Sequence, residues 1–221
     1  MKRRLEQGLL KHLAAAAIAL SAGCYDPAED LARIPSKVLD EVVDDIEDAE
    51  WERGDRLRLL TLLSHDRRVA VRARVAQHAA GLWSDSQGEI ESLLQRLAAD
   101  EAHTVRDAAA NSFEQVLSQA PPVDRIRLVA EWATSEVRGQ RRALARALRA
   151  STPVFIGDLA IEQLIRDASP AVRAYAAQAL ASHFEEDPRG YRQLAIELAA
   201  DPVRRIRRGA RRVLDRASDE A

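Results

Sequence analysis

Residues 167–177 have the sequence DASPAVRAYAA: an Asp, a short polar turn, a hydrophobic–Arg pair and a run of small residues. The hydrophobic–Arg pair recurs along the chain at successive intervals of 34, 32, 35 and 34 residues. The five occurrences are Val71-Arg72, Val105-Arg106, Val137-Arg138, Val172-Arg173 and Ile206-Arg207. A fixed period between roughly 20 and 50 residues is typical of stacked structural repeats rather than of one globular core. We number these repeats one to five.

Each repeat is predicted to be a pair of α-helices. The chain is 47% hydrophobic but only 4% aromatic, so its apolar surface is mostly Ala, Leu and Val, which suits closely packed helices. A Leu- or Ile-rich cluster, such as Leu59 to Leu63, marks the first helix, and a polar turn and a second helix follow. In repeat four the apolar residues of the second helix share one face, and Arg173 lies on the same face.

The Arg on this apolar face needs a carboxylate partner, because burying an unpaired guanidinium is costly. An Asp stands five residues before the hydrophobic anchor in four of the five repeats. These residues are Asp66, Asp100, Asp167 and Asp201. In the turn between the two helices, each Asp can accept backbone N–H groups and reach the Arg of its own or a neighbouring repeat.

The turn Asp, the hydrophobic–Arg pair and the small residues together resemble HEAT repeats, over about residues 36–218. The resemblance implies an all-α fold, a right-handed α-solenoid of about five helix pairs in which Asp and Arg side chains form a ladder inside the stack. It also implies that a partner binds the concave surface lined by the second helices. A helix over residues 36–46, apolar on one face and acidic on the other, would cap the start of the stack. The solenoid is expected to span residues 35–221.

Repeat three departs from this pattern. Trp132 stands where the other repeats have the turn Asp, and Leu144 and Leu148 come one residue early relative to repeat four. We therefore expect a local bend or a break in the ladder at this repeat. Glu131 or Glu136 could take the place of the missing acid.

The N-terminus has the order of a secretory signal: a basic start, an uncharged run over residues 13–20 and then Ser21-Ala22-Gly23-Cys24. Cys24 is the only cysteine, and small residues directly before it resemble the lipobox of bacterial lipoproteins. The family prefers Leu where this chain has Ser21. The alternative interpretation is an amphipathic N-terminal helix with a chance Cys.

The lipoprotein resemblance implies a division of the N-terminus and a location. Residues 1–23 would be the signal peptide, Cys24 the lipidation site and residues 24–34 an acidic tether. The protein would then be anchored in the bacterial cell envelope and face the periplasm, because several acyl chains hold a protein in a membrane. Tyr25, rather than the Asp that retains some lipoproteins in the inner membrane, favours the outer membrane.

No catalytic, metal or cofactor site stands out in the sequence. The five His residues are scattered without the spacing or Cys neighbours of a metal site. There is no Gly-rich phosphate loop and no nucleophile elbow around a Ser. We therefore expect a protein that is not an enzyme, with no catalytic residue, no metal and no cofactor.

The candidate partner-binding residues face away from the apolar stripe of each second helix. Counted from the hydrophobic anchors above, the positions at +2, +3 and +6 would line the concave surface. Those with polar or aromatic side chains that we assign to partner binding are Arg74, Gln77, Asp107, Asn111, Gln140, Tyr175, Gln178, Arg208 and Arg212. This mixed lining fits contact with a protein partner, and solvation alone would also explain it.

Charge is distributed unevenly along the chain, although the formal net charge is only -2. Residues 189–216 contain nine Arg against three acidic residues. This cluster is either a patch for an anionic ligand or a set of side chains that complement the last helix and keep it soluble. No aromatic residues alternate with these Arg residues, which argues against single-stranded nucleic acid as the ligand.

The sequence thus predicts a lipid-anchored, non-catalytic envelope scaffold that binds a protein through the concave face of a HEAT-like solenoid. The alternative is an intracellular HEAT-like DNA-binding protein or alkylbase DNA glycosylase, which needs a basic groove carrying an Asp and aromatic residues. A third hypothesis, a chromophore-lyase-like enzyme with short HEAT units, has no dedicated site in the sequence. Export to the envelope would discriminate among the three.

Overall fold

The computed structural model describes residues 34–44, 53–84, 86–150, 154–185 and 187–219. Within these ranges the regular structure is entirely helical. None of the helices described there is long and apolar enough to cross a membrane. The predicted signal peptide, Cys24 and almost all of the tether lie outside the described residues, so these assignments stay predictions.

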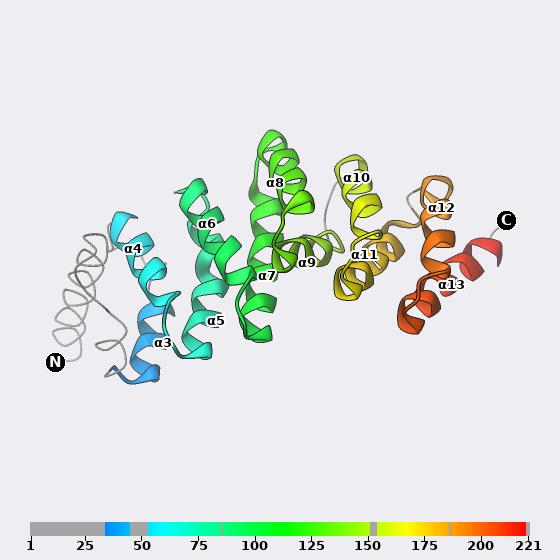
Figure 1. Ribbon diagram of the computed structural model, residues 1–221. Helices are drawn as coiled ribbons and strands as arrows, with labels where there is room; N and C mark the ends of the chain where they lie inside the picture. The colour runs from blue at the N-terminus through cyan, green and yellow to red at the C-terminus, as the bar shows by residue number, and fades with distance from the viewer. Residues whose placement is uncertain (1–33, 45–52, 85, 151–153, 186, 220–221) are drawn as a thin grey trace. The chain divides into compact units, whose positions relative to one another are not determined.

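The chain divides into two compact units, an N-terminal unit that ends at Ser112 and a C-terminal unit that begins at Phe113. The helices of the N-terminal unit are α3 (Ser36–Asp44), α4 (Arg53–Leu63), α5 (Val69–His78), the short 3-10 helix η2 (Ala79–Leu82), α6 (Gln87–Ala98) and the first part of α7 (His103–Gln119). First helices α4 and α6 contact each other, and α3 packs against the second helix α5 (Figure 1).

The C-terminal unit repeats the same arrangement. After the end of α7 it contains α8 (Pro122–Thr134), α9 (Arg138–Ala147), α10 (Val154–Leu164), α11 (Pro170–His183), α12 (Pro188–Ala199) and α13 (Arg204–Asp219). The second helices α9, α11 and α13 pack side by side, and each of the first helices α8, α10 and α12 packs on its own second helix (Figure 1). Helix pairs stacked in chain order confirm the predicted all-α solenoid class.

Small residues on the second helices and Leu on the first helices build the core. In the N-terminal unit Leu60, Leu63, Ile90 and Leu94 have no exposed surface. Leu39 and Val43 of α3 are equally buried, which agrees with the predicted capping helix. Each fully buried Leu or Ile stabilises the fold by about 1.5–3 kcal/mol relative to an exposed one.

The C-terminal unit contains an aromatic stack that changes the interpretation of Trp132. The Trp132 ring lies 3.6 Å from the Phe113 ring, centre to centre, with 9° between their planes. Trp132 is wholly buried in α8 and is not in the turn between α8 and α9. The prediction that it occupies the position of the turn Asp is therefore wrong: Trp132 is a core residue.

The arginine–aspartate ladder and a candidate binding face

Each turn Asp closes the turn between the two helices of its own repeat. One carboxylate oxygen accepts the backbone N–H two residues further on, at 2.7 to 2.8 Å. The four pairs are Asp66 with Arg68, Asp100 with Ala102, Asp167 with Ser169 and Asp201 with Val203. This bond satisfies a donor at the start of the second helix that would otherwise have no partner.

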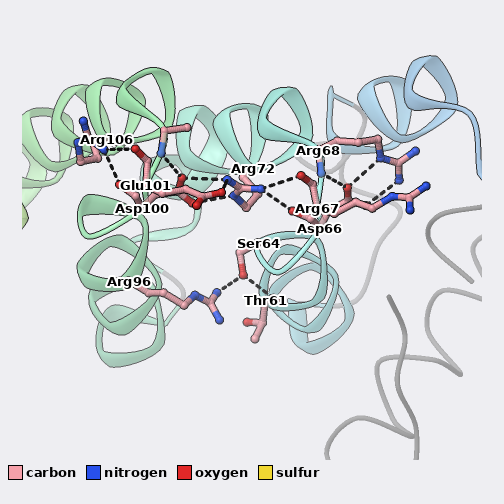
Figure 2. Close-up of polar contacts among 11 residues, drawn as sticks. Thr61, Ser64, Asp66, Arg67, Arg68, Arg72, Arg96, Asp100, Glu101 and Arg106 are labelled. Atoms are coloured by element: carbon pink, nitrogen blue, oxygen red, sulfur yellow. Dashed lines mark hydrogen bonds and ion pairs between the residues drawn. The ribbon is translucent and has the colours of Figure 1, made fainter. Parts of the chain in front are cut away.

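The Arg six residues after the turn residue joins neighbouring repeats. Arg72 Nη1 donates to the main-chain carbonyls of Asp66 and Arg67, at 2.8 and 3.1 Å. Its Nε and Nη2 donate to both oxygens of Asp100 in the next turn, at 2.7 and 3.0 Å (Figure 2). In the C-terminal unit Arg173 makes the same set of bonds to its own turn and to Asp201.

The ladder is electrostatically tight because it is mostly shielded from water. Burial alone would raise the pKa of Asp100, but the bonds from Arg72 and from the Ala102 N–H outweigh it and hold that pKa below its usual value. The hydrogen bond to Asp100 raises the pKa of Arg72 in return. Every strong donor and acceptor of the pair is used internally, so these arginines have a structural role, as the sequence predicted.

The ladder arginine of repeat three is Arg141, not Arg138. Arg141 Nη1 donates to the carbonyls of Ser135 and Glu136 at 2.6 and 3.1 Å, and Nε donates to Asp167 at 2.5 Å. Ser135 Oγ accepts the Val137 N–H at 3.0 Å, as an Asp does in the other turns. The ladder arginines are therefore 34, 35, 32 and 34 residues apart, from Arg72 to 106, 141, 173 and 207.

The turn of repeat three lacks the carboxylate that the other turns have, because Ser135 stands in its place. In the N-terminal unit, Arg106 donates to the carbonyls of Asp100 and Glu101, at 2.6 and 2.5 Å. Arg106 forms no ion pair within the described ranges. Neither Glu131 nor Glu136 takes the place of the missing turn acid. Glu131 pairs with Arg127 at 2.9 Å, and Glu136 contributes only its main-chain carbonyl to Arg141.

We use the term second-helix face for the positions at +2, +3 and +6 from the anchor of each second helix. With Arg141 as the ladder arginine, the anchor of α9 shifts, and so do the side chains that lie on this face. Gln140 occupies the anchor position itself, where its Oε1 accepts a hydrogen bond from Ser135 Oγ at 2.5 Å. Its assignment to the outward row is therefore corrected, and the outward positions of α9 are Arg142 and Arg146.

On the second-helix face of the N-terminal unit, polar side chains pair with one another. Arg74 donates to both carboxylate oxygens of Asp44 at 2.6 and 2.7 Å, and to Gln77 at 3.2 Å. The bond from Arg74 lowers the pKa of Asp44 despite the opposing effect of burial. Asp107 is half-buried and Asn111 is exposed. This face has mixed charge, and its Arg is already matched by an acid.

The second-helix face of the C-terminal unit is hollowed into an open groove of about 610 Å³. The residues around it come from α11, α13 and the end of α9. They are Arg149, Ala174, Tyr175, Ala177, Gln178, Ala181, Arg205, Ile206, Arg208, Gly209 and Arg212. The groove thus brings together four of the predicted site residues: Tyr175, Gln178, Arg208 and Arg212.

We call this concavity the arginine groove. Two arginines hold its neutral polar side chains, Tyr175 and Gln178, in place. The Arg142 guanidinium lies 5.3 Å from the centre of the Tyr175 ring, and its Nη2 donates to the Tyr175 hydroxyl at 3.4 Å. Arg149 Nη1 donates to Gln178 Oε1 at 3.0 Å. Tyr175 and Gln178 are therefore oriented before any ligand arrives.

The arginine groove carries uncompensated positive charge. No acidic residue lines it. Arg205, Arg208 and Arg212 are exposed and form no hydrogen bond or ion pair with any residue that the structure describes. Four guanidiniums facing one groove without a counterion create a positive potential that attracts anions.

A second cavity, of about 710 Å³, lies beside the first helices α8 and α10 and has a different character. Its lining includes Arg141 with Asp167, and Arg166 with Glu162. Arg166 also binds Glu197 at 2.8 Å, and both carboxylates raise its pKa. Each of these arginines is already paired with a carboxylate, so this cavity offers an anion little.

The described residues contain no group of three or more His, Cys, Asp or Glu side chains that could hold a metal ion. One buried His has a structural bond instead: a ring nitrogen of His183 lies 2.7 Å from the carbonyl oxygen of Leu148. This contact joins α11 to the end of α9.

Stacked helix pairs with turns joined by arginines define an α-solenoid of helical repeats, and comparison with known proteins supports that class. No protein-family model and no curated protein matches the chain. Among solved structures, smu.31 from Streptococcus mutans UA159 aligns with a TM-score of 0.61 and 19% identity, over 90% of this chain and 96% of that one.

Two longer proteins resemble it in the same way. Cex1p aligns with a TM-score of 0.57 and 14% identity, over 96% of this chain and 44% of its own. Importin beta aligns with a TM-score of 0.51 and 18% identity, over 82% of this chain and 26% of its own. At these identities the likeness concerns the fold alone, which is a helical solenoid.

The sequence assignment missed four of the six arginines that lie on the second-helix face of the C-terminal unit or line its groove. Arg142 and Arg146 were hidden by the wrong anchor in repeat three, whereas Arg149 and Arg205 lie outside the +2, +3 and +6 positions. A signal for the first two was present: with Gln140 as the anchor, Leu144 falls at +4 and Leu148 at +8, like Ala176 and Leu180 in repeat four.

Proposed function

We propose that this protein is a non-catalytic HEAT-like scaffold that binds a protein partner through its second-helix face, with the arginine groove as the main contact. The observation that carries the proposal is the set of exposed guanidiniums around one concavity whose lining contains no acid. The ladder holds the helices that carry these side chains, so little ordering is required when a partner binds.

The proposal extends to the location of the scaffold. Acylation of Cys24 would tether it to the bacterial envelope by residues 24–34 and present the groove to periplasmic partners. The Cys24→Ala variant tests this point, because it should keep the mass of residues 1–23 and should lack the mass of the acyl groups. Unchanged membrane association and an unchanged mature mass would remove the lipoprotein assignment and make an intracellular role more attractive.

An intracellular DNA-binding protein or alkylbase DNA glycosylase remains the second candidate, because an arginine-lined groove could also bind phosphates. The glycosylase alternative requires an Asp and several aromatic side chains on the groove. The lining contains no acid and one aromatic residue, Tyr175. The positive face of the C-terminal unit has no counterpart on α5, where Arg74 is paired with Asp44. These features favour a local protein contact over a long nucleic-acid track.

Partner capture from envelope extract tests the scaffold function. The Arg208→Glu/Arg212→Glu variant places two acids in the groove, whereas Arg204→Glu/Arg211→Glu makes the same charge change on α13 outside its lining. We expect cross-linked partners of the wild-type protein to be lost with the first variant and kept with the second. If both variants lost the cross-linked partners equally, the interaction would depend on net charge and not on the groove. If the wild-type protein captured no partner, the proposal that this face binds one would lose its support.

A further inference from the structure

The charge and shape of the arginine groove point to the chemistry of its occupant. This inference rests on the proposed function, because it names what the same groove recognises. Arg149, Arg205, Arg208 and Arg212 face it, and the lining contains no carboxylate. Like charges so arranged repel one another, and an anionic segment with several negative charges would relieve that repulsion at several positions at once.

Guanidinium side chains in this protein already bind carboxylates in one recurring geometry. Arg72 with Asp100, Arg74 with Asp44 and Arg166 with Glu197 each use Nε and Nη2 on the two oxygens of one carboxylate. This two-point contact requires the planar fork of Arg and is not available to Lys. All of the basic residues that line the groove are Arg.

The uncharged part of the groove lining suits a polypeptide. Besides Tyr175, Gln178 and Ile206 it consists of small residues, Ala174, Ala177 and Ala181, with Gly209 on α13. A methyl group at Gly209 would meet nothing within 4 Å, so space above it is open. A volume of about 610 Å³ lies in the range of roughly 300–1,000 Å³ that is typical of ligand pockets, which matches a short segment rather than a globular surface.

The same lining is unfavourable for a nucleic-acid strand. Non-specific binding of single strands combines positive charge with aromatic platforms on which successive bases stack. The groove has one aromatic ring, Tyr175, and the Arg142 guanidinium already lies beside it. A peptide needs no such platform, because its backbone can approach the small Ala side chains of the lining while its acidic side chains reach the arginines.

We propose that the arginine groove binds an Asp- and Glu-rich segment of the protein partner, with the carboxylates held in the two-point manner of the ladder. Arg208 and Arg212, one turn apart on α13, would bind successive acidic side chains. Arg149 would contact the segment from the end of α9, opposite α13. Tyr175 and Gln178, held by Arg142 and Arg149, would meet the peptide backbone between them.

Fluorescence anisotropy with a defined probe tests the inference. The probe is a fluorescein-labelled octapeptide in which Glu and Ala alternate, and the comparison probe has Gln in place of every Glu. We expect the Glu peptide to bind the full-length protein and to lose affinity as salt rises, because the contacts are exposed. We expect the Gln peptide not to bind. Equal binding of the two peptides would overturn the inference.

Matched variants separate the groove from net charge. The Arg208→Glu/Arg212→Glu variant should bind the Glu peptide with an affinity lower by about tenfold or more. The Arg204→Glu/Arg211→Glu variant should lose only about twofold in affinity for the same peptide. Arg208→Lys/Arg212→Lys keeps the charge and removes the fork, so a loss of several-fold is expected. Equal effects of the two Glu variants, at unchanged circular dichroism and unfolding midpoint, would contradict a specific groove.

A fluorescein-labelled oligothymidine of eight nucleotides is the competing probe. Binding tighter than that of the Glu peptide would replace the acidic-peptide assignment with a nucleic-acid one. Failure of the acidic-segment inference can be distinguished from failure of the scaffold function. If partner capture depends on Arg208 and Arg212 but the Glu peptide does not bind, the scaffold function stands and the acidic-segment inference fails; if capture does not depend on them, the function fails as well.

Discussion

Arg141 and Asp167 form an ion pair with 2.5 Å between Nε and Oδ2, and this pair establishes how repeat three fits its neighbour. The Asp167 side chain is 6% exposed and that of Arg141 is 19% exposed, so the pair is largely shielded from water. Arg141 also ties the turn at Ser135 and Glu136 to its own helix. One side chain therefore joins a turn, a helix and the next repeat.

Replacing Arg141 by Ala should lower the free energy of unfolding by about 2–4 kcal/mol, because it leaves the buried Asp167 carboxylate without its guanidinium partner. Arg138→Ala is the matched control: this Arg lies on the same helix, is exposed and has no bonded partner in the described part of the chain. Its cost should be within about 0.5 kcal/mol. Urea denaturation of both variants checks the register, and the opposite ranking would restore Arg138 to the ladder.

Trp132 should behave as a core residue in the same kind of experiment. Trp132→Ala removes the ring that stacks on Phe113 and should cost about 3–5 kcal/mol. Trp132→Phe should cost much less, because the ring stack can be kept and the indole Nε1 has no hydrogen-bond partner among the described residues. Unfolding midpoints measure both variants. A small loss for Trp132→Ala, as for a residue of an exposed turn, would be inconsistent with this stack.

The helix pairs and the ladder were predictable from the sequence because both depend on regular physical requirements. A half-buried Arg needs a carboxylate, and the period of the Asp residues matched that of the Arg residues in repeats one, two, four and five. Repeat three was misassigned because Val137-Arg138 has the same local composition as an anchor pair. Val137 is in fact 38% exposed. Burial and the reach of Arg141 to Asp167 determine the register, and neither is visible in a dipeptide.

The arginine groove could be predicted only in part for a related reason. Helical geometry places four of its residues on the second-helix face once their anchors are known: Tyr175, Gln178, Arg208 and Arg212. Arg149 and Arg205 lie elsewhere on the helical wheel and line the groove because of how α9, α11 and α13 pack. Which arginines pair with acids is likewise a property of the tertiary structure. Arg74 and Arg208 have similar sequence positions, but Arg74 is paired with Asp44.

His65 should make stability depend on pH below neutrality. Burial and then the nearby Arg96 lower the pKa of His65 beneath its ordinary 6.5. The Arg96 guanidinium contacts the His65 ring. It also donates to Ser64 Oγ (Figure 2). The unfolded chain therefore takes up a proton first as the pH falls. Stability should be full above pH 6.5 and decrease below it.

The His65→Gln variant should reduce that dependence. Its urea midpoint should change less between pH 7 and pH 5 than the midpoint of the wild-type protein. His103→Gln is the control, because His103 is an exposed residue at the start of α7 in the same unit. A change in the pH profile that both variants share would not depend on the Arg96 contact. Identical profiles for His65→Gln and the wild type would show that the Arg96 contact does not affect protonation.

Asp201 should give stability that is lost at acidic pH. Burial would raise its pKa, but the bonds from Arg173 and the Val203 N–H outweigh burial and lower the pKa below the ordinary 3.8. The folded state therefore favours the ionised form. This contribution is present above about pH 4, the pKa of Asp in an unfolded chain, and is lost as the pH falls through the lower folded-state value.

Asp201→Asn should cost about 2–4 kcal/mol at pH 7, because Arg173 then loses the charge of its partner while its side chain stays 12% exposed. At pH 2–3 the difference from the wild type should shrink, since the wild-type carboxylate is itself being protonated. Asp215→Asn, at an exposed position on α13, should cost little at either pH. Urea denaturation at the two pH values measures all three proteins. A difference for Asp201→Asn that stays constant with pH would mean that shape and hydrogen bonding, rather than charge, hold this rung of the ladder.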